Sequence, residues 1–437
     1  MIYGGDGLAR LPADDHGRGK AAFVPFVLGG EKIEASITEQ KAGFARAHAD
    51  SIIERSPHRV EPGCPYFRQC GGCHYQHASY EHQLQIKSAI LSETLRRTAK
   101  VGLAVDIVIH SSPPWNYRNR SRLQVQVGPE FKAGYFKIGS HELLAVEECP
   151  ISSPLINRGL AELWRSGLEG KVPPGVREVE FFANGDDTEL LVEVSTDPEA
   201  KRSAVRGWAE EFLDSLPEIA GVTAFRETKT GNAYSEEKLV GVGADHLIYK
   251  TQRSSYRVSA GSFFQTNRHL TDELVRIVVG GQSGELAVDL YAGAGLFSTA
   301  LASDFHHIVS VESSQTSSAD LSYNQPSNGQ TVQATTEQYL SGMAKTGRVG
   351  KGAVLPHIIH KPDLAVVDPP RSGLGERVAR MLATLGAPRV TYVSCDPVTL
   401  SRDLVTLLGA GYRIEQVHLV DLFPQTYHLE SVVHLVC

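Results

Sequence analysis

Residues 286–297 read Leu-Ala-Val-Asp-Leu-Tyr-Ala-Gly-Ala-Gly-Leu-Phe, and this stretch decides the fold of the C-terminal part of the chain. Its apolar start predicts a buried strand, and Gly293 and Gly295 mark a tight turn that leads into a helix from Ser298. From about residue 250 onward, strand-like and helix-like segments alternate, with glycine at their junctions. This alternation predicts a doubly wound α/β domain, which we place at residues 249–437.

The same glycine turn predicts a cofactor site. Glycine lets the backbone approach a ligand closely, and the N-terminus of the following helix faces that ligand. The next strand ends at Glu312, about 20 residues further on, where an acidic residue contacts ribose hydroxyls. NAD and S-adenosylmethionine enzymes share this arrangement, but Ser298 stands where the NAD pattern has glycine or alanine. Because Asp289 before the turn also fits S-adenosylmethionine better, we expect that cofactor.

Composition narrows the class of protein. The chain has 437 residues, 41% hydrophobic and 21% charged, as in a soluble protein of about two to four domains. No apolar run approaches the roughly 20 residues of a membrane span, and the start lacks a secretory signal, so we expect a cytoplasmic protein. The net charge of −7 counts only weakly against nucleic acid, because local patches decide that binding.

Residues 1–57 have the pattern of a small all-β module. Strand-like residues 21–28 end at two glycines, and residues 32–38 alternate with a period of two, as a half-buried strand does. Short strands between glycine turns fit a five-stranded barrel of the OB type, which commonly binds oligonucleotides, and a generic β-cap fits them equally well. The first strand of such a barrel is short or absent, so we expect a truncated start.

The cysteines are unevenly distributed. Three lie close together and a fourth follows later: Cys64, Cys70, Cys73 and Cys149. Four thiolates are enough for one tetrahedral zinc site or a cubane iron–sulfur cluster, and the spacing does not separate the two. His74 and His77 are alternative ligands. We expect a structural metal site in residues 58–100, which also contain an amphipathic helix pattern over residues 81–97.

Residues 101–248 predict a central α+β domain that grips RNA and supplies Cys149 to the metal site. Its strand-like stretch after Pro114 places Arg118, Arg120 and Arg122 on one face. A basic row beside aromatic residues suits phosphate contact and base stacking. The alternative is a solvated edge strand, which arginine would also protect.

Three segments indicate the chemistry. Residues 389–394 predict a strand that Asp396-Pro397 ends, so Cys395 lies at the carboxyl end of a strand, where open α/β sheets bind ligands. A thiol there can be a nucleophile, although a lone cysteine is more often structural. A fourth strand ends at Asp368-Pro-Pro, and this carboxylate can accept a hydrogen bond from the N–H of a planar heterocycle.

These residues suit methyl transfer to C5 of uracil. This carbon is not nucleophilic enough to accept a methyl group without help. A thiolate that adds at C6 makes C5 enolate-like, and a separate base must later remove the C5 proton. Cys395 supplies the nucleophile. Glu430 in an apolar, strand-like run is the expected base, because a carboxylate is costly to bury without purpose, and His428 ranks second.

Taken together, these motifs closely resemble the class I RNA uracil-C5 methyltransferases over essentially the whole chain. The opening Tyr-Gly-Gly-Asp-Gly-Leu-Ala-Arg is similar to a TRAM domain, and Gly-Ser-Phe-Phe-Gln-Thr-Asn at residues 261–267 resembles the cofactor segment of the family. The resemblance implies a Rossmann-like methyltransferase domain. It implies that S-adenosylmethionine is bound by Gln265, Tyr291, Glu312 and Asp368. It also implies Cys395 as nucleophile, Glu430 as base, and a [4Fe-4S] cluster on Cys64, Cys70, Cys73 and Cys149.

Within the family, the TRAM-like module and the cysteines favour 23S rRNA as substrate over tRNA. We expect a monomer that binds neither DNA nor membranes. A non-catalytic RNA-binding iron–sulfur protein is the alternative from another class, and the cysteine–glutamate pair argues against it. A DNA cytosine-C5 methyltransferase would carry Pro-Cys and Glu-Asn-Val motifs, which this chain lacks in those places. Asp396 departs from the asparagine frequent in relatives, so the acidity of the neighbouring thiol is expected to differ.

Overall fold

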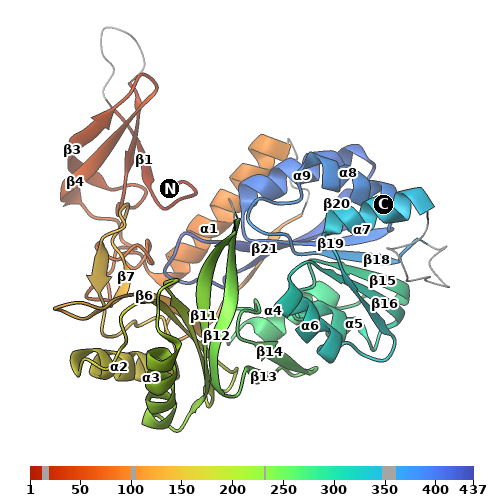
Figure 1. Ribbon diagram of the computed structural model, residues 1–437. Helices are drawn as coiled ribbons and strands as arrows, with labels where there is room; N and C mark the ends of the chain where they lie inside the picture. Colours follow the sequence, from red (N-terminus) through yellow and green to blue (C-terminus); the bar gives the residue numbers. More distant parts are fainter. Residues whose placement is uncertain (12–18, 100–104, 231–232, 347–360) are drawn as a thin grey trace.

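The computed structural model describes residues 1–11, 19–99, 105–230, 233–346 and 361–437. These residues form a small N-terminal sheet, a central sheet with two helices, and a larger sheet covered by helices on both faces (Figure 1). No helix in these ranges is both long and apolar enough to cross a membrane.

The largest sheet has eight strands, in the order β17-β16-β15-β18-β19-β21-β20-β5. Its strands are β15 (Gly284–Leu290), β16 (Phe305–Glu312), β17 (Gly329–Gln333), β18 (Leu364–Val367), β19 (Arg389–Ser394), β20 (Arg413–Val420), β21 (Glu430–Val436) and β5 (Ile107–His110). Strands β15 to β19 pair in parallel, and β21 runs antiparallel to both of its neighbours. The predicted doubly wound α/β domain is therefore confirmed.

Helices cover both faces of this sheet. The helices are α1 (Tyr80–Thr94), α4 (Thr271–Val279), α5 (Leu296–Leu301), α6 (Gln315–Asn324), α7 (Thr336–Thr346), α8 (Gly375–Leu385) and α9 (Pro397–Gly409). Within β15, Leu286, Val288 and Leu290 pack into the core under α1, α7, α8 and α9, whereas Ala287 packs into the opposite core with α4 and α5. This alternation follows from the period of two along a strand, and it explains why the strands are apolar throughout.

The central sheet has seven strands, in the order β12-β11-β10-β9-β6-β7-β8. They are β6 (Arg120–Gln126), β7 (Lys132–Phe136), β8 (Leu143–Ala145), β9 (Val176–Ala183), β10 (Leu190–Thr196), β11 (Ile219–Thr230) and β12 (Ala233–Gly243). Helices α2 (Pro154–Leu168) and α3 (Arg202–Ser215) pack their apolar sides into its core. The hairpin of β13 (His246–Lys250) and β14 (Ser255–Ser259) joins the core that also contains α4 and α5.

The N-terminal module differs in detail from the predicted five-stranded barrel. Its described residues form four strands, in the order β1-β2-β4-β3. They are β1 (Gly7–Arg10), β2 (Ala21–Val24), β3 (Lys32–Gln40) and β4 (Phe44–Glu54). Among the described strands, β3 pairs with β4 alone, so it lies at the edge and is mostly exposed rather than half-buried as expected.

Two segments before residue 111 belong to the C-terminal core and not to the regions where the sequence placed them. Strand β5 lies at the edge of the eight-stranded sheet and pairs with β20, although we expected residues 101–248 to form a separate domain. Helix α1 buries Ile86, Ile90 and Leu91 in that core and continues into a π-helical turn at Leu95–Ala99. The expected boundary between residues 100 and 101 lies outside the described residues.

Candidate active site

The site lies along the carboxyl edge of the eight-stranded sheet. Strands β15, β16, β18 and β19 are parallel, and the chain leaves them at Tyr291, Glu312, Asp368 and Cys395. Strand β21 runs in the opposite direction, so its first residue, Glu430, lies at this same edge. The fold thus brings five of the predicted site residues to one edge, which is where open α/β sheets bind their ligands.

The strand register places the two predicted catalytic residues opposite each other. Ser394 is the partner of Ser431 in the antiparallel pair of β19 and β21, and the Oγ of Ser431 donates to the carbonyl of Ser394 at 3.2 Å. The residue after Ser394 is Cys395, and the residue before Ser431 is Glu430. Continuing the register by one residue therefore sets the thiol beside the carboxylate, because the directly opposed residues of an antiparallel pair are neighbours.

Burial and nearby negative charge raise the pKa values of both groups. Burial raises the pKa of the half-buried Cys395 thiol to about 12, and the carboxylates of Glu430 and Asp368 add to this effect. Glu430 is only 6% exposed, and burial followed by the charge of Asp368 raises its pKa well above the usual value. The Arg371 guanidinium opposes both shifts. Cys395 thus depends on nearby positive charge to become a thiolate.

Two further acids complete a cluster that favours a cation. Burial raises the pKa of Asp289 to about 7, and burial together with Asp289 raises the pKa of Asp368 to about 7. One carboxylate oxygen of Asp289 accepts from the Ser298 hydroxyl, and the other is buried with no hydrogen-bond partner among the described residues. Several acids gathered in one site are costly unless a cation neutralises them. A ligand with positive charge, such as a sulfonium, fits this cluster.

The glycine turn after β15 lets a ligand approach the backbone closely. The amide of Gly293 donates to Glu312 at 2.9 Å, so the turn and the end of β16 are held together. Gly295 has a φ of +94°, and a Cβ atom there would lie 2.9 Å from the Cδ1 of Leu321. Tyr291 also has a positive φ, of 64°, which strains a residue that is not glycine. Strain of this kind persists only where the surrounding structure enforces it.

The segment at residues 261–267 connects the central sheet to this edge. Gly261 donates its amide to Glu193 of β10 at 2.7 Å, and the side-chain amide of Asn267 donates to the carbonyl of Leu422 at 3.2 Å. Gln265 between them is 8% exposed. The segment that carries Gln265 is therefore fixed on both sides of this residue.

The predicted basic row for RNA contact is wrong. Arg120 forms an ion pair with Glu180 at 3.5 Å, donates to the carbonyl of Ser262 at 2.6 Å, and lies over the ring of Phe182. Arg122 pairs with three carboxylates of the central sheet: Glu178, Glu180 and Glu193. The cause is the register, because β6 is an interior strand and Arg122 is the strand partner of Glu180. Period-two alternation shows which residues share a face but not what faces them.

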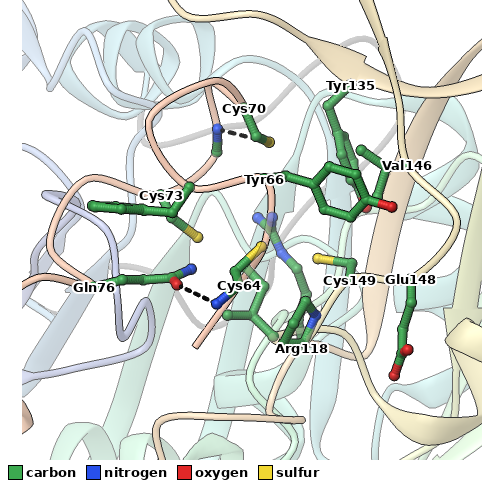
Figure 2. A pocket seen from close by; sticks show the side chains of 14 residues that line it. Cys64, Tyr66, Cys70, Cys73, Gln76, Arg118, Tyr135, Val146, Glu148 and Cys149 are labelled. Carbon is green, nitrogen blue, oxygen red and sulfur yellow. Dashed lines mark hydrogen bonds between the residues drawn. The ribbon is translucent and has the colours of Figure 1, made fainter. Parts of the chain in front are cut away.

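The four predicted cysteine ligands line one pocket (Figure 2). Its volume is about 50 Å³, and Phe67, Val146 and Ile151 contribute apolar walls. Burial raises the pKa of Cys70 to about 11 and that of Cys73 to about 12. Neither alternative ligand, His74 or His77, lines the pocket. Within the described ranges, no three His, Cys, Asp or Glu side chains already stand in a metal-binding arrangement.

Four cysteines around an apolar pocket nevertheless fit a metal–thiolate centre. Thiolates are the ligands of structural zinc and of iron–sulfur clusters, and metal binding removes the thiol protons that burial otherwise retains. Two hydrogen bonds fix the backbone at these cysteines. The backbone amide of Cys64 donates to the side chain of Gln76 at 3.1 Å, and that of Cys149 donates to the side chain of Asn157 at 2.9 Å.

The part of the chain that contains Cys64, Cys70 and Cys73 also forms hydrogen bonds with the loop that precedes Glu430. We call residues 64–87 the cysteine segment and residues 421–428 the base loop. The amides of His74 and Tyr75 both donate to the carbonyl of Gln425 at 2.9 Å. The buried amide side chain of Gln83 bonds the Gln425 side chain at 2.9 Å and its backbone amide at 3.0 Å. The base loop is thus fastened to the cysteine segment a few residues before Glu430.

A buried ion pair reinforces this junction. The Lys87 ammonium lies 2.6 Å from Asp421, and both side chains are 0% exposed. Replacing Lys87 with methionine is expected to lower the free energy of unfolding by about 3–5 kcal/mol, because Asp421 is left buried without its partner. Urea unfolding measures this loss. The exposed pair of Lys137 and Glu142 provides the control, since Lys137→Met should cost no more than about 1 kcal/mol. Equal losses in the two variants would contradict the role of burial.

The N-terminal segment reaches the loop that carries Cys395. The hydroxyl of Tyr3 donates to the Asp396 carboxylate at 3.2 Å, and its ring packs edge-on against Tyr427 of the base loop. The other oxygen of Asp396 accepts from the amides of Val398 and Thr399, so Asp396 caps α9. Asparagine can also cap a helix, so the departure at Asp396 keeps the cap and adds a negative charge next to Cys395.

Comparison with known proteins identifies the family of this chain. A family model described as tRNA (Uracil-5-)-methyltransferase matches residues 233–437. An uncharacterized RNA methyltransferase of Aquifex aeolicus is 31% identical over 441 residues, which cover 100% of this chain and 96% of that protein. The chain belongs to the family of RNA uracil-C5 methyltransferases.

Other relatives extend over the same length. An uncharacterized RNA methyltransferase of Streptomyces avermitilis is 31% identical to this methyltransferase, covering 100% of this chain and 96% of the relative. The tRNA (uracil-54, C5)-methyltransferase of Pyrococcus abyssi, solved with S-adenosyl-L-homocysteine, superposes with a TM-score of 0.73. It is 22% identical and covers 99% of this chain and 100% of its own, so the two share the fold.

Two residues of the methyltransferase site escaped the sequence analysis. Arg371 directly follows Asp368-Pro-Pro. This motif pointed to Asp368 as a site residue, but a surface arginine after a turn has no distinctive pattern of its own. Tyr3 lies 393 residues before Asp396 in the chain, and no local pattern can connect them. Both act on Cys395 or its loop, which shows that the setting of the thiol depends on long-range packing.

Proposed function

We propose that this methyltransferase forms 5-methyluridine in RNA by covalent catalysis from Cys395. The observation that carries the proposal is the register of β19 and β21, which sets Cys395 opposite Glu430 at the ligand-binding edge of the sheet. The reaction needs a nucleophile and a separate base on one pyrimidine ring. We place this reaction in the cytoplasm, where the protein would modify RNA without binding a membrane.

The steps follow from the two side chains. The Cys395 thiolate adds to C6 of uracil and forms a C–S bond, and the electron pair moves to C5. S-adenosylmethionine, when bound, supplies a sulfonium methyl group that C5 attacks, which leaves S-adenosylhomocysteine. Glu430 then takes the C5 proton, the C6–S bond breaks, and Cys395 departs as the thiolate.

Glu430 is a better base than His428. Burial and then the charge of Arg371 lower the pKa of His428 to about 3, so the imidazole holds a proton weakly. Burial and Asp368 raise the pKa of Glu430, which makes its carboxylate a stronger base. Efficient proton transfer requires a base whose conjugate acid is stable near the working pH. Of the two candidates, Glu430 meets that requirement.

We assign the cofactor to the glycine turn and its neighbours. Gln265, Tyr291, Glu312 and Asp368 would contact S-adenosylmethionine. The support comes from their common edge, from the strained backbone of Tyr291 and from the buried, unpartnered oxygen of Asp289. The positive sulfonium would also relieve the repulsion among the acids and so favour the Cys395 thiolate.

Arg371 should tune the acidity of the nucleophile. It lowers the pKa of Cys395, so replacing Arg371 with glutamine is expected to raise that pKa further. Covalent addition at neutral pH should then slow, because the thiolate fraction falls about tenfold each time the pKa of the thiol rises by one. The measurement is the pH dependence of adduct formation with RNA that contains 5-fluorouridine, whose C–F bond blocks the last step. Addition should rise with pH in both proteins, and the rise should lie at higher pH in the variant.

Two controls isolate the charge of Arg371. Arg371→Lys keeps the charge and should keep most of the wild-type profile. Arg377→Gln removes an exposed arginine that pairs with Glu337 on the neighbouring helix, and it should change nothing. A wild-type pH profile for Arg371→Gln would show that Arg371 does not act on the thiol.

We further propose that Cys64, Cys70, Cys73 and Cys149 hold a [4Fe-4S] cluster of structural role, with zinc as the alternative centre for the same ligands. Iron and sulfide analysis of protein purified without oxygen separates the two. The N-terminal sheet would act as a TRAM-like module and the central sheet would grip RNA beside it, with domain limits near residues 57 and 248.

The substrate RNA is proposed to be 23S rRNA, because of the TRAM-like module and the four cysteines. Transfer RNA is the second candidate, since the matching family is described by tRNA and the Pyrococcus abyssi enzyme acts on uracil 54 of tRNA. The direct test uses each RNA with tritium at uracil C5, and S-adenosylmethionine should cause release of tritium into water from the true substrate. Failure to release tritium from either RNA would refute the proposal. Mapping 5-methyluridine in a knockout then identifies the site.

A further inference from the structure

Arg118 is a charged side chain that lines the four-cysteine pocket (Figure 2). No ion pair among the described residues includes it, and its Nε is buried without a hydrogen-bond partner. The two other arginines of this stretch behave differently, because Arg120 and Arg122 both pair with glutamates of the central sheet. Of Arg118, Arg120 and Arg122, Arg118 alone lines the cysteine pocket.

The backbone fixes this direction. The amide of Arg118 donates to the carbonyl of Ile151 at 2.9 Å, and its carbonyl accepts from the amide of Ser153 at 2.8 Å. On its other side Arg118 forms a bridge with Asn267, two residues after Gln265. Because hydrogen bonds fix the main chain of Arg118 on both sides, its side chain has a fixed position beside the cysteines.

A guanidinium in such a setting requires an anion. Removing a charge from water without a partner is costly, and proteins accept this cost only where an opposite charge is present. The one carboxylate that lines this pocket, Glu148, is exposed to water and forms no ion pair with Arg118 among the described residues. Four thiolates around a metal centre carry net negative charge, and one added electron increases it.

We propose that Arg118 is the counter-charge of an anionic metal–thiolate centre on Cys64, Cys70, Cys73 and Cys149. The proposal rests on the cluster assigned under the proposed function. Arg118 stabilises the bound centre, and it stabilises the reduced state more than the oxidised state because the reduced state has more negative charge. It thereby raises the reduction potential of the cluster and slows its loss. These effects concern the centre itself and do not involve the methyl transfer.

The experiment compares full-length variants purified without oxygen. Arg118→Met and Arg118→Gln remove the charge, and Arg118→Lys keeps it. Arg68→Met is the matched control, because Arg68 lies in the loop between Cys64 and Cys70 but is exposed to water, which screens its charge. Iron and sulfide content, the midpoint potential by electrochemical titration, and the rate of iron loss to a chelator are measured for each, with circular dichroism as the test of folding.

The neutral variants should show a more negative midpoint potential and lose iron about 10- to 100-fold faster, as expected when a group outside the ligand set is removed. Arg118→Lys and Arg68→Met should stay near wild type. Folded neutral variants with the wild-type potential and rate would overturn the role of Arg118 and leave the cluster in place. Wild-type protein without iron and sulfide would overturn the cluster, and the inference with it. If neither neutral variant folds, Arg118→Lys decides, because a large shift of potential with the charge retained overturns the proposal.

Discussion

Replacing Cys395 with alanine is expected to abolish methyl transfer, by about 10⁴-fold or more, and to remove every covalent complex with RNA. The reason is that C5 of uracil becomes nucleophilic only after a thiolate has bonded to C6. Binding of RNA and of S-adenosylmethionine should persist, because Cys395 contributes one small side chain to the site. Tritium release from C5-labelled RNA measures the reaction, and a gel shift under denaturing conditions measures the covalent complex.

Cys437 offers a matched control for this variant. It is also a free cysteine of the same domain, but it is exposed at the end of β21 and lies away from the ligand-binding edge. Cys437→Ala should therefore retain wild-type activity. Tritium release from Cys395→Ala at a rate close to that of wild type would show that addition to C6 uses another group or does not occur.

Replacing Glu430 with glutamine is expected to trap the enzyme on its RNA. Addition and methyl transfer need no base at C5, whereas elimination does, and loss of a positioned base slows proton transfer by about 10²- to 10⁴-fold. A methylated, covalent protein–RNA complex should accumulate with natural uridine RNA and S-adenosylmethionine. Denaturing electrophoresis with a labelled methyl group detects it, because the label should move with the protein.

The control for Glu430 is Glu415, an exposed glutamate on the adjacent strand β20. Glu415→Gln should turn over normally and trap nothing. Normal turnover by Glu430→Gln would remove Glu430 from its role and return attention to His428. A Glu430→Gln protein that releases no tritium and also forms no complex would instead place Glu430 before the addition step.

The sequence was sufficient for those parts of the site that lie at the ends of strands. Asp368 and Cys395 each follow a short apolar run and precede proline or a turn, and such boundaries are visible locally. A parallel sheet then brings these ends to one edge. The role of each residue at that edge remains a proposal, because position alone does not distinguish a nucleophile from a packed cysteine.

The sequence failed where partners come from distant strands. The alternation placed Arg120 and Arg122 on one face, but the glutamates that pair with them belong to β9 and β10, and Arg118 turns instead to the cysteine pocket. Strand β5 has only four residues and too little pattern to reveal that it extends the C-terminal sheet. Register and pairing between remote segments are decided by the whole fold, so a single sequence predicts them poorly.

The junction between the cysteine segment and the base loop has a consequence for how the chain is made. Gln83 and Gln425 are separated by 342 residues, and Lys87 and Asp421 by 334. A nascent chain leaving the ribosome therefore carries α1 with its apolar side uncovered and its lysine unpaired until nearly the whole protein has been synthesised. Contacts of such long range form slowly and expose aggregation-prone surface meanwhile. We expect this methyltransferase to depend on chaperones during translation more than its ordinary composition suggests.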